Sequence, residues 1–187
     1  MPRRTRTNRE LGGFTPGYRR KWADPEWQLG LTRLEKALWQ QLSEQPTMSH
    51  AGVLQVDCDT LAEQHPDCSP HDIERDLAGL QSKGYIRREG QWLHLIGWFA
   101  NNPSMNNPNH LLPTLRAIDT IGRRQLRHDV STELLNYYAG EAPTANLSAA
   151  IITALRDHAT KWQLRLPDEL QRPIRAVRAD DRRQKRA

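Results

Sequence analysis

The sequence predicts a mainly α-helical fold with a small β-hairpin, that is, an α+β fold. Apolar residues recur every three or four positions through most of the chain between residues 22 and 170, which is the spacing of amphipathic helices. Two short β-prone segments flank a Glu-Gly turn at residues 89–90 and predict the hairpin. With 187 residues, of which 37% are hydrophobic, the chain can form one globular domain or two small ones.

The first predicted helix covers residues 33–44. Thr32 can cap this helix, and Glu35 completes a capping box three residues later. Pro46 ends the helix, because proline has no backbone N–H to continue it. The apolar stripe is expected to contain three leucines at four-residue spacing, Leu34, Leu38 and Leu42.

A strand and two more helices follow. Residues 53–56 form a short run with the β-branched residues Val53 and Val56, which predicts an isolated strand. A short helix is expected at 60–65. Ser69 then caps another helix with Pro70 at its first position, and Gly84 ends it. The buried stripe of this helix is expected to consist of Ile73, Leu77 and Leu80.

The hairpin is predicted from residues 85–88 and 91–96. The predicted order is therefore helix, strand, helix, tight turn, helix and hairpin. A helix-turn-helix followed by a two-stranded wing is the arrangement of a winged-helix domain. The sequence thus predicts a winged helix-turn-helix domain at residues 22–121.

A helical extension is predicted at residues 122–170. Ahead of it, a repeated Asn-Asn-Pro predicts a loop, and Pro108 can start a helix that Pro113 interrupts or restarts. Within the extension, the apolar spacing predicts one helix around 124–138 and another at about 146–162. The extension either packs on the winged helix or forms a small subdomain.

Several segments carry a resemblance to a known family. They are Tyr18-Arg19-Arg20-Lys21-Trp22, then Leu38-Trp39, then Ile73-Glu74-Arg75-Asp76-Leu77-Ala78-Gly79-Leu80 with Lys83-Gly84-Tyr85-Ile86, and finally Trp98-Phe99-Ala100-Asn101-Asn102-Pro103 with Asn106-Asn107-Pro108-Asn109. Together they resemble the N-terminal winged-helix module of bacteriophage and prophage replication proteins, the replisome organisers, over residues 18–121. In that module a hydrophobic strand runs into the Asn-Pro loop and then into a helix. The resemblance implies binding to phage DNA, in replication or its regulation, in the cytoplasm of a bacterial host.

The net charge of +5 is carried by the two ends of the chain. Residues 1–21 hold seven basic residues against one acidic residue, and residues 171–187 hold seven against two. The residues between these ends are net acidic. Arginine-rich arms are a common electrostatic footprint for phosphate backbones, although solubilising tails have the same composition. Both ends are expected to be flexible, and DNA contacts are expected from Arg3, Arg4, Arg6, Arg19 and Arg20.

DNA contacts are also expected from the winged helix. The second helix of a helix-turn-helix enters the major groove, with the residues opposite its core stripe facing the bases. Basic residues on the wing and after Ile121 can contact phosphates. The candidate DNA-binding residues are His71, Arg75, Gln81 and Ser82 on the helix, Arg87, Arg88 and Trp92 on the wing, and Arg123, Arg124 and Arg127 after it.

A protein-interaction module is the alternative. The predicted recognition helix carries more carboxylates than cations, and a carboxylate near phosphate opposes DNA binding. The acidic residues are Asp72, Glu74 and Asp76, and the basic ones are Arg75 and Lys83. In this alternative, the helix or the extension docks on a host replication, transcription or defence complex.

Other functional classes find little support. The chain has no phosphate-cradling glycine loop and no nucleophile motif, so no enzyme activity is expected. Cys58, His65, Cys68 and His71 are spaced unlike any familiar zinc finger, so neither a metal nor a cofactor is expected. No apolar run suits a membrane span or a secretory signal, and two cysteines fit a reducing compartment. Duplex DNA is the expected partner. The sequence does not decide whether the protein forms a homodimer.

Overall fold

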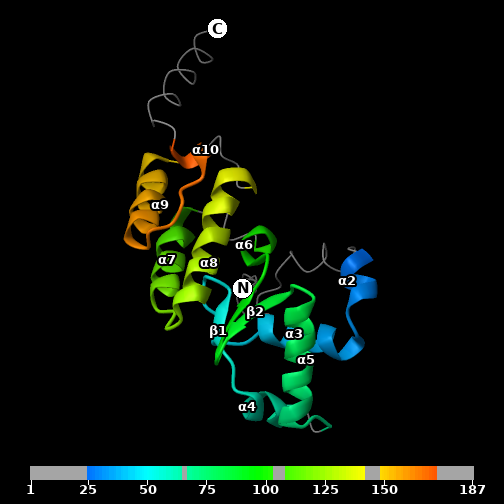
Figure 1. Cartoon of the computed structure of the whole chain (residues 1–187). Helices are drawn as coiled ribbons and strands as arrows, with labels where there is room; N and C mark the ends of the chain where they lie inside the picture. The colour runs from blue at the N-terminus through cyan, green and yellow to red at the C-terminus, as the bar shows by residue number, and fades with distance from the viewer. Residues whose placement is uncertain (1–24, 65–66, 103–107, 142–147, 172–187) are drawn as a thin grey trace, which may run out of the picture.

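The computed structural model describes residues 25–64, 67–102, 108–141 and 148–171, and it is mainly helical with one small antiparallel sheet (Figure 1). The elements in chain order are α2 (Pro25–Gly30), α3 (Arg33–Ser43), β1 (Val53–Gln55), α4 (Cys58–Glu63), α5 (Pro70–Ser82), β2 (Ile86–Glu89), β3 (Trp92–Leu95), α6 (Trp98–Asn101), the 3-10 turn η2 (Pro108–His110), α7 (Leu111–Asp119), α8 (Arg124–Asn136), the π turn η3 (Tyr137–Glu141), α9 (Ala149–Lys161) and α10 (Asp168–Gln171). The predicted α+β class is confirmed. None of the described helices is long and apolar enough to span a bilayer.

The capping box predicted for α3 and the Ser69 cap predicted for α5 are both present. Thr32 Oγ1 accepts a hydrogen bond from the Glu35 backbone N–H at 3.2 Å, and Glu35 Oε2 accepts one from the Thr32 N–H at 2.7 Å. Ser69 and Asp72 exchange the same pair of bonds at the start of α5. These exchanges satisfy backbone donors that the first turn of a helix leaves unpaired. Helices α3 and α5 therefore begin where the sequence predicts.

The predicted stripe of α3 is wrong at one position. Leu38 and Leu42 are buried, but Leu34 is 51% exposed. Residues four apart on an α-helix differ in direction by about 40°, so three leucines at this spacing drift around the helix. Glu35 and Trp39 occupy buried positions of α3 instead. On α5 the whole predicted stripe is buried, namely Ile73, Leu77 and Leu80.

The strand predicted to be isolated belongs to the sheet. Strand β1 pairs antiparallel with β3, and β3 also pairs with β2, so the strand order is β1-β3-β2. Strands β1 and β3 are almost forty residues apart in the sequence, so no local sequence pattern predicts their pairing. The predicted hairpin is present, but its turn consists of Gly90 and Gln91 and not of Glu89 and Gly90, because Glu89 is the last residue of β2 and pairs with Trp92. Gly90 has a φ of 64°, which suits glycine.

The sheet separates two hydrophobic clusters. One contains α2 to α5, and the other contains Phe99 of α6 with α7 to α10 (Figure 1). The adjacent residues Val53 and Leu54 lie in different clusters, because successive strand side chains point to opposite faces. Trp98 packs against both clusters.

Helices α2 and α10 are not predicted by the apolar spacing. Trp27 of α2 is 1% exposed and packs edge-to-face on Trp39 and Tyr85, at ring-centre distances of 5.0 and 5.2 Å. In α10, Leu170 is 2% exposed. Both helices are too short to show a helical period, and each is fixed by a single buried anchor.

Two details after the hairpin differ from the predictions. Residues 98–101 form helix α6, not the strand that the family resemblance implies. Gly97, with a φ of 76°, turns the chain out of β3, and the Asn101 side chain then donates to Gly97 O at 2.8 Å. Pro113 neither interrupts nor restarts α7, because it lies in the first turn, where the backbone N–H has no intrahelical partner.

The two helices predicted for the extension correspond to α8 and α9. Helix α8 ends at Asn136 and passes into η3, two residues before the predicted end. Helix α9 begins at Ala149, after the predicted start near 146, because Ser148 caps it by accepting a hydrogen bond from the Ile151 N–H. The extension packs on the hairpin.

Stability is expected to fall in mild acid because of His158 on α9. His158 is 5% exposed, with Nε2 3.0 Å from Ser131 Oγ. Burial lowers the pKa of His158, although Asp119 acts in the opposite direction. As the pH falls, His158 is therefore protonated at a higher pH in the unfolded chain than in the folded chain. Below about pH 6.5 the free energy of unfolding should fall by up to about 1 kcal/mol per pH unit.

Urea unfolding on either side of that pH measures the effect. The variant His158→Gln keeps a polar group beside Ser131 but does not titrate. The difference in stability between about pH 7.5 and about pH 5.5 should therefore be smaller in this variant. An unchanged difference would show that His158 is not the responsible group.

Candidate nucleic-acid interface

One face of α5 is exposed along the helix. His71, Arg75 and Ser82 lie on it, as the helical geometry predicts, with Ala78 near its centre. Gln81 is also exposed and flanks this face on the side of the hairpin. A cleft between α5 and the hairpin is lined by Glu74, Leu77, Ala78, Gln81, Arg88 and Gly90. Of the predicted residues of α5, the structure thus brings Gln81 close to the hairpin turn.

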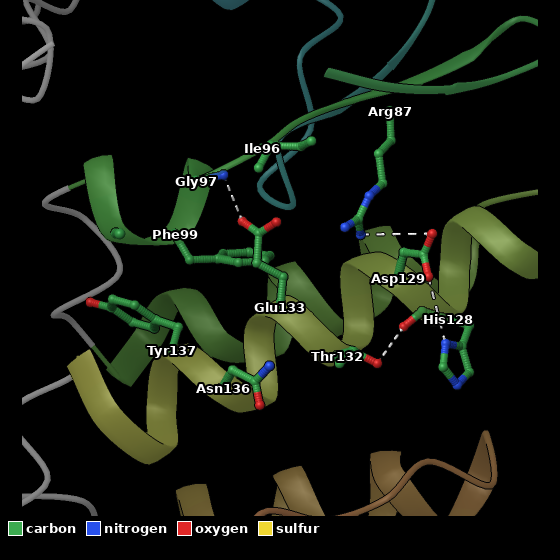
Figure 2. A pocket seen from close by; sticks show the side chains of 11 residues that line it. Arg87, Ile96, Gly97, Phe99, His128, Asp129, Thr132, Glu133, Asn136 and Tyr137 are labelled. Atoms are coloured by element: carbon green, nitrogen blue, oxygen red, sulfur yellow. Dashed lines mark hydrogen bonds and ion pairs between the residues drawn. The ribbon is translucent and has the colours of Figure 1, made fainter. Parts of the chain in front are cut away.

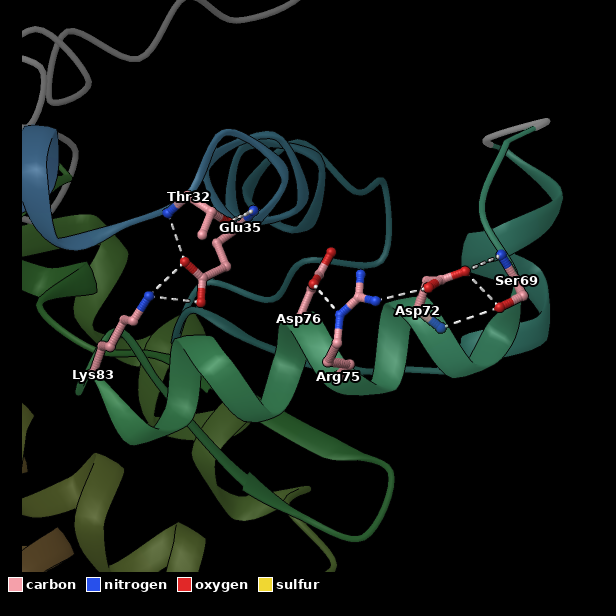
Figure 3. A network of polar contacts seen from close by, with 7 residues as sticks. All are labelled: Thr32, Glu35, Ser69, Asp72, Arg75, Asp76 and Lys83. Carbon is pink, nitrogen blue, oxygen red and sulfur yellow. Dashed lines mark hydrogen bonds and ion pairs between the residues drawn. The ribbon is translucent and has the colours of Figure 1, made fainter.

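The Arg75 guanidinium is held by two carboxylates of its own helix. Nη1 lies 3.0 Å from Asp72 Oδ1, and Nε lies 3.2 Å from Asp76 Oδ1 (Figure 3). Hydrogen bonds from Ser69, together with the charge of Arg75, lower the pKa of Asp72. Although 56% of the Arg75 side chain is exposed, its charge is balanced locally. A DNA contact by Arg75 would compete with both carboxylates.

Lys83, directly after α5, is also paired. Its Nζ lies 2.7 and 2.9 Å from the two carboxylate oxygens of Glu35 on α3 (Figure 3). Burial opposes ionisation of Glu35, but hydrogen bonds from Lys83 and Thr32 prevail and lower its pKa. Gly79 packs directly on this carboxylate, since a Cβ there would overlap Glu35 Oε1. Lys83 therefore joins α5 to α3.

Arg88 joins the hairpin to α5. Its Nη1 lies 2.7 Å from both carboxylate oxygens of Glu74, and its Nε donates to Gly90 O at 2.9 Å. Its backbone N–H donates to Gln81 Oε1 at 3.0 Å. Cys58 Sγ donates to Glu74 at 3.1 Å, and burial together with this carboxylate raises the pKa of the thiol to about 11. Arg88 and Gln81, both candidate DNA contacts, hold the hairpin in place.

The other side of the hairpin docks on α8. A Glu89 carboxylate oxygen accepts a hydrogen bond from the Leu126 N–H at 3.1 Å. This carboxylate caps α8, whose N-cap residue Arg123 makes no side-chain capping bond. Arg87 Nη1 lies 3.7 Å from Asp129 Oδ2 on the next turn of α8 (Figure 2). The wing candidate Arg87 is thus part of the junction with the extension.

A buried histidine and a glutamate complete this junction. His94 of β3 is 0% exposed, with Nδ1 3.2 Å from Gly52 O and Nε2 3.1 Å from Glu133 Oε2. The other Glu133 oxygen accepts a hydrogen bond from the Gly97 N–H at 3.0 Å (Figure 2). Glu133 therefore ties α8 to β3 and to the start of α6.

Arg123 and Trp92 lie at the hairpin turn. The Arg123 guanidinium is so close to Gly90 that a Cβ there would be 3.1 Å from Nη2. Trp92 is half-buried against the α7 to α10 cluster, with its Nε1 beside Gly122, so only part of its ring is open to stack on a base. Arg123 is exposed, and among the described residues no carboxylate pairs with it.

Arg124 and Arg127 line a second cleft, at the start of α8. The Arg127 guanidinium lies 4.1 Å from the ring centre of Trp162, and its Nε donates to Ile121 O at 3.1 Å. Lys161, Trp162 and Gln163 line this cleft as well and are absent from the predicted site. No local pattern links residue 127 to residue 162, although six tryptophans in one chain is a high number.

The predicted arm contacts lie outside the described residues. This applies to Arg3, Arg4, Arg6, Arg19 and Arg20, and to the first segment of the family resemblance at 18–22. It also applies to the basic tail at 171–187, apart from Gln171 at the end of α10. Their contacts with DNA stay predictions.

Comparison of the chain with models of protein families, with curated proteins and with solved structures finds no match. Evidence for a function therefore comes from the chain itself. Its two notable surfaces are the exposed face of α5 and the arginines that follow the hairpin.

Proposed function

We propose that this protein is a winged-helix protein that binds duplex DNA. Helices α3, α4 and α5 and the β1-β3-β2 sheet follow the order of such a domain, with α5 as the recognition helix and the hairpin as the wing. The observation that carries the proposal is the exposed face of α5 beside the hairpin turn. It carries His71, Arg75 and Ser82, and Gln81 flanks it on the side of the hairpin.

In this proposal α5 enters the major groove. His71 and Ser82 carry groups that can donate or accept hydrogen bonds at base edges, and a guanidinium such as Arg75 can pair with guanine. Since Arg75 must leave two carboxylates to do so, it contributes to selectivity more than to attraction. Attraction comes from cations that no carboxylate of the described residues pairs with, above all Arg123 at the turn.

A role in bacteriophage DNA replication, or in its regulation, rests on the resemblance of residues 18–121 to replisome organisers. The resembling residues include most of α5, which is the element that would read the bases. Selection of bound sequences from random duplexes would test this role. Repeated sites within replication genes support initiation, whereas sites at promoters support regulation.

The variant Ala78→Glu is expected to weaken duplex binding at least about tenfold. Ala78 is exposed near the centre of the α5 face, so the new carboxylate would meet phosphates and base acceptors without disturbing the core. Fluorescence anisotropy with a labelled duplex, at about 50 mM and about 200 mM salt, measures the affinity of the full chain.

Ala78→Gln is the matched control, because glutamine has the same length as glutamate without the charge. Its affinity is expected to stay within about threefold of the unchanged protein. Circular dichroism and urea unfolding verify that both variants are folded. Equal affinities of the glutamate and glutamine variants would show that α5 does not enter the groove.

The pairing of the cations around α5 favours one other function, docking on a protein complex. Arg75, Lys83 and Arg88 each contact a carboxylate, so this side of the molecule presents a polar surface with little positive charge. A protein-docking module would show no duplex binding even at low salt. The fluorescence anisotropy titration with a labelled duplex therefore distinguishes docking on a protein complex from DNA binding.

A further inference from the structure

A basic cleft lies between α8 and the end of α9. These two helices lie on the opposite side of the hairpin from α5 (Figure 1). The cleft has a volume of about 510 Å³ and is lined by Arg124, Arg127, His128, Lys161, Trp162 and Gln163. None of these residues carries a carboxylate, and two arginines and one lysine are cations at neutral pH. The lining therefore suits an anionic ligand.

Only one of these cations is balanced in the part of the chain that the structure describes. Lys161 Nζ lies 2.7 Å from Asp119 Oδ2. Arg127 donates to a backbone carbonyl, that of Ile121, and Arg124 pairs with no described carboxylate. Two guanidinium charges are thus left unbalanced at one surface, and they attract anions.

The cleft is built before any ligand binds. Trp162 Nε1 donates to Asp119 Oδ1 at 2.9 Å, and the Arg127 guanidinium lies on the Trp162 ring. Burial opposes ionisation of Asp119, but hydrogen bonds from Lys161 and Trp162 prevail and lower its pKa. Arg127 is therefore fixed by a ring and a carbonyl, and its remaining N–H donors keep their orientation.

We propose that this cleft binds phosphates of the DNA backbone, as a contact region beyond the hairpin. A guanidinium fork matches the oxygens of a phosphate. Arg123 lies at the hairpin turn and the next residue, Arg124, lines the cleft, so a DNA strand that passes the turn continues into the cleft. This inference rests on the proposed DNA binding and adds a contact that does not involve α5.

The variant Arg124→Gln tests the cleft, with Arg33→Gln as its matched control. Each removes one exposed arginine, and Arg33 lies on α3, outside the cleft. Arg124→Gln is expected to weaken binding of a labelled duplex about fivefold and to reduce the slope of log affinity against log salt by about 1. Arg33→Gln should change the affinity less than about twofold.

A spectroscopic readout shows whether DNA reaches the cleft itself. The indole N–H signal of Trp162, assigned with Trp162→Phe, is expected to shift when duplex is added to the full-length protein. This shift should be smaller at equal occupancy in Arg124→Gln. An unchanged Trp162 signal, or equal losses of affinity in the two arginine variants, overturns the cleft proposal.

The outcomes keep the two proposals apart. If duplex binds but Arg124→Gln has no specific effect, the cleft proposal fails and the winged-helix proposal stands. If Ala78→Glu binds normally while Arg124→Gln loses affinity and salt dependence, the cleft stands and the role of α5 fails. Absence of duplex binding at about 50 mM salt overturns both.

Discussion

Substituting Glu133→Ala is expected to lower the free energy of unfolding by about 3 kcal/mol. The Glu133 carboxylate accepts a hydrogen bond from the Gly97 N–H at 3.0 Å and lies 3.1 Å from His94 Nε2. His94 is fully buried in the intact protein, so the loss of Glu133 leaves a polar ring nitrogen of the core without its hydrogen-bond partner. Urea unfolding followed by tryptophan fluorescence measures the change.

Asp129→Ala is the matched control, because Asp129 lies on the same helix and also reaches the hairpin. Its contact with Arg87 is longer, at 3.7 Å, and the Arg87 side chain is 46% exposed. Exposed pairs of this kind contribute little, so the expected loss is less than about 1 kcal/mol. Equal losses in the two variants would show that the His94–Glu133 contact does not carry the junction between the hairpin and α8.

The helices of the proposed DNA-binding part could be predicted because their signals are local. The capping boxes of α3 and α5 each span four residues, and the turn of the hairpin contains only Gly90 and Gln91. In each case the residues that form the contact are neighbours in the sequence. The pairing of β1 could not be predicted in this way, because its partner strand β3 is almost forty residues away in the sequence.

The state of the candidate cations could not be predicted, since their partners are distant in the sequence. Arg88 pairs with Glu74, fourteen residues earlier, and Lys83 with Glu35, forty-eight residues earlier. Residue types and helical faces place these cations on a surface but do not show that a carboxylate already holds them. The sequence therefore overstates the free positive charge around α5.

The hairpin is fixed from both sides, and this bears on the proposed function. Arg88 holds it to α5, whereas Glu89 holds it to the start of α8. The turn, α5 and the basic cleft therefore keep fixed positions relative to one another. A DNA duplex bound by α5 would meet Arg123 and the cleft as a preformed surface, without the ordering cost of a mobile wing.

Gly52→Ala is expected to be the most damaging single methyl addition, with a loss of about 4 kcal/mol or failure to fold. Gly52 has a φ of 67°, and a Cβ there would overlap Trp98, coming within 2.7 Å of its Cδ2. Trp98 cannot retreat easily, because it packs against both hydrophobic clusters and its Nε1 donates to His50 O at 3.1 Å. Yield of soluble protein and urea unfolding measure the effect.

Gly84→Ala separates the two causes of this loss. Gly84 has a similar φ of 76°, but a Cβ there would meet nothing within 4 Å. Its expected loss of about 1 kcal/mol therefore reports the backbone strain alone. The additional loss of stability in Gly52→Ala measures the overlap with Trp98, the residue that packs against both hydrophobic clusters. If both alanines cost the same, Trp98 can move without loss, and the contact between the clusters is looser than its packing indicates.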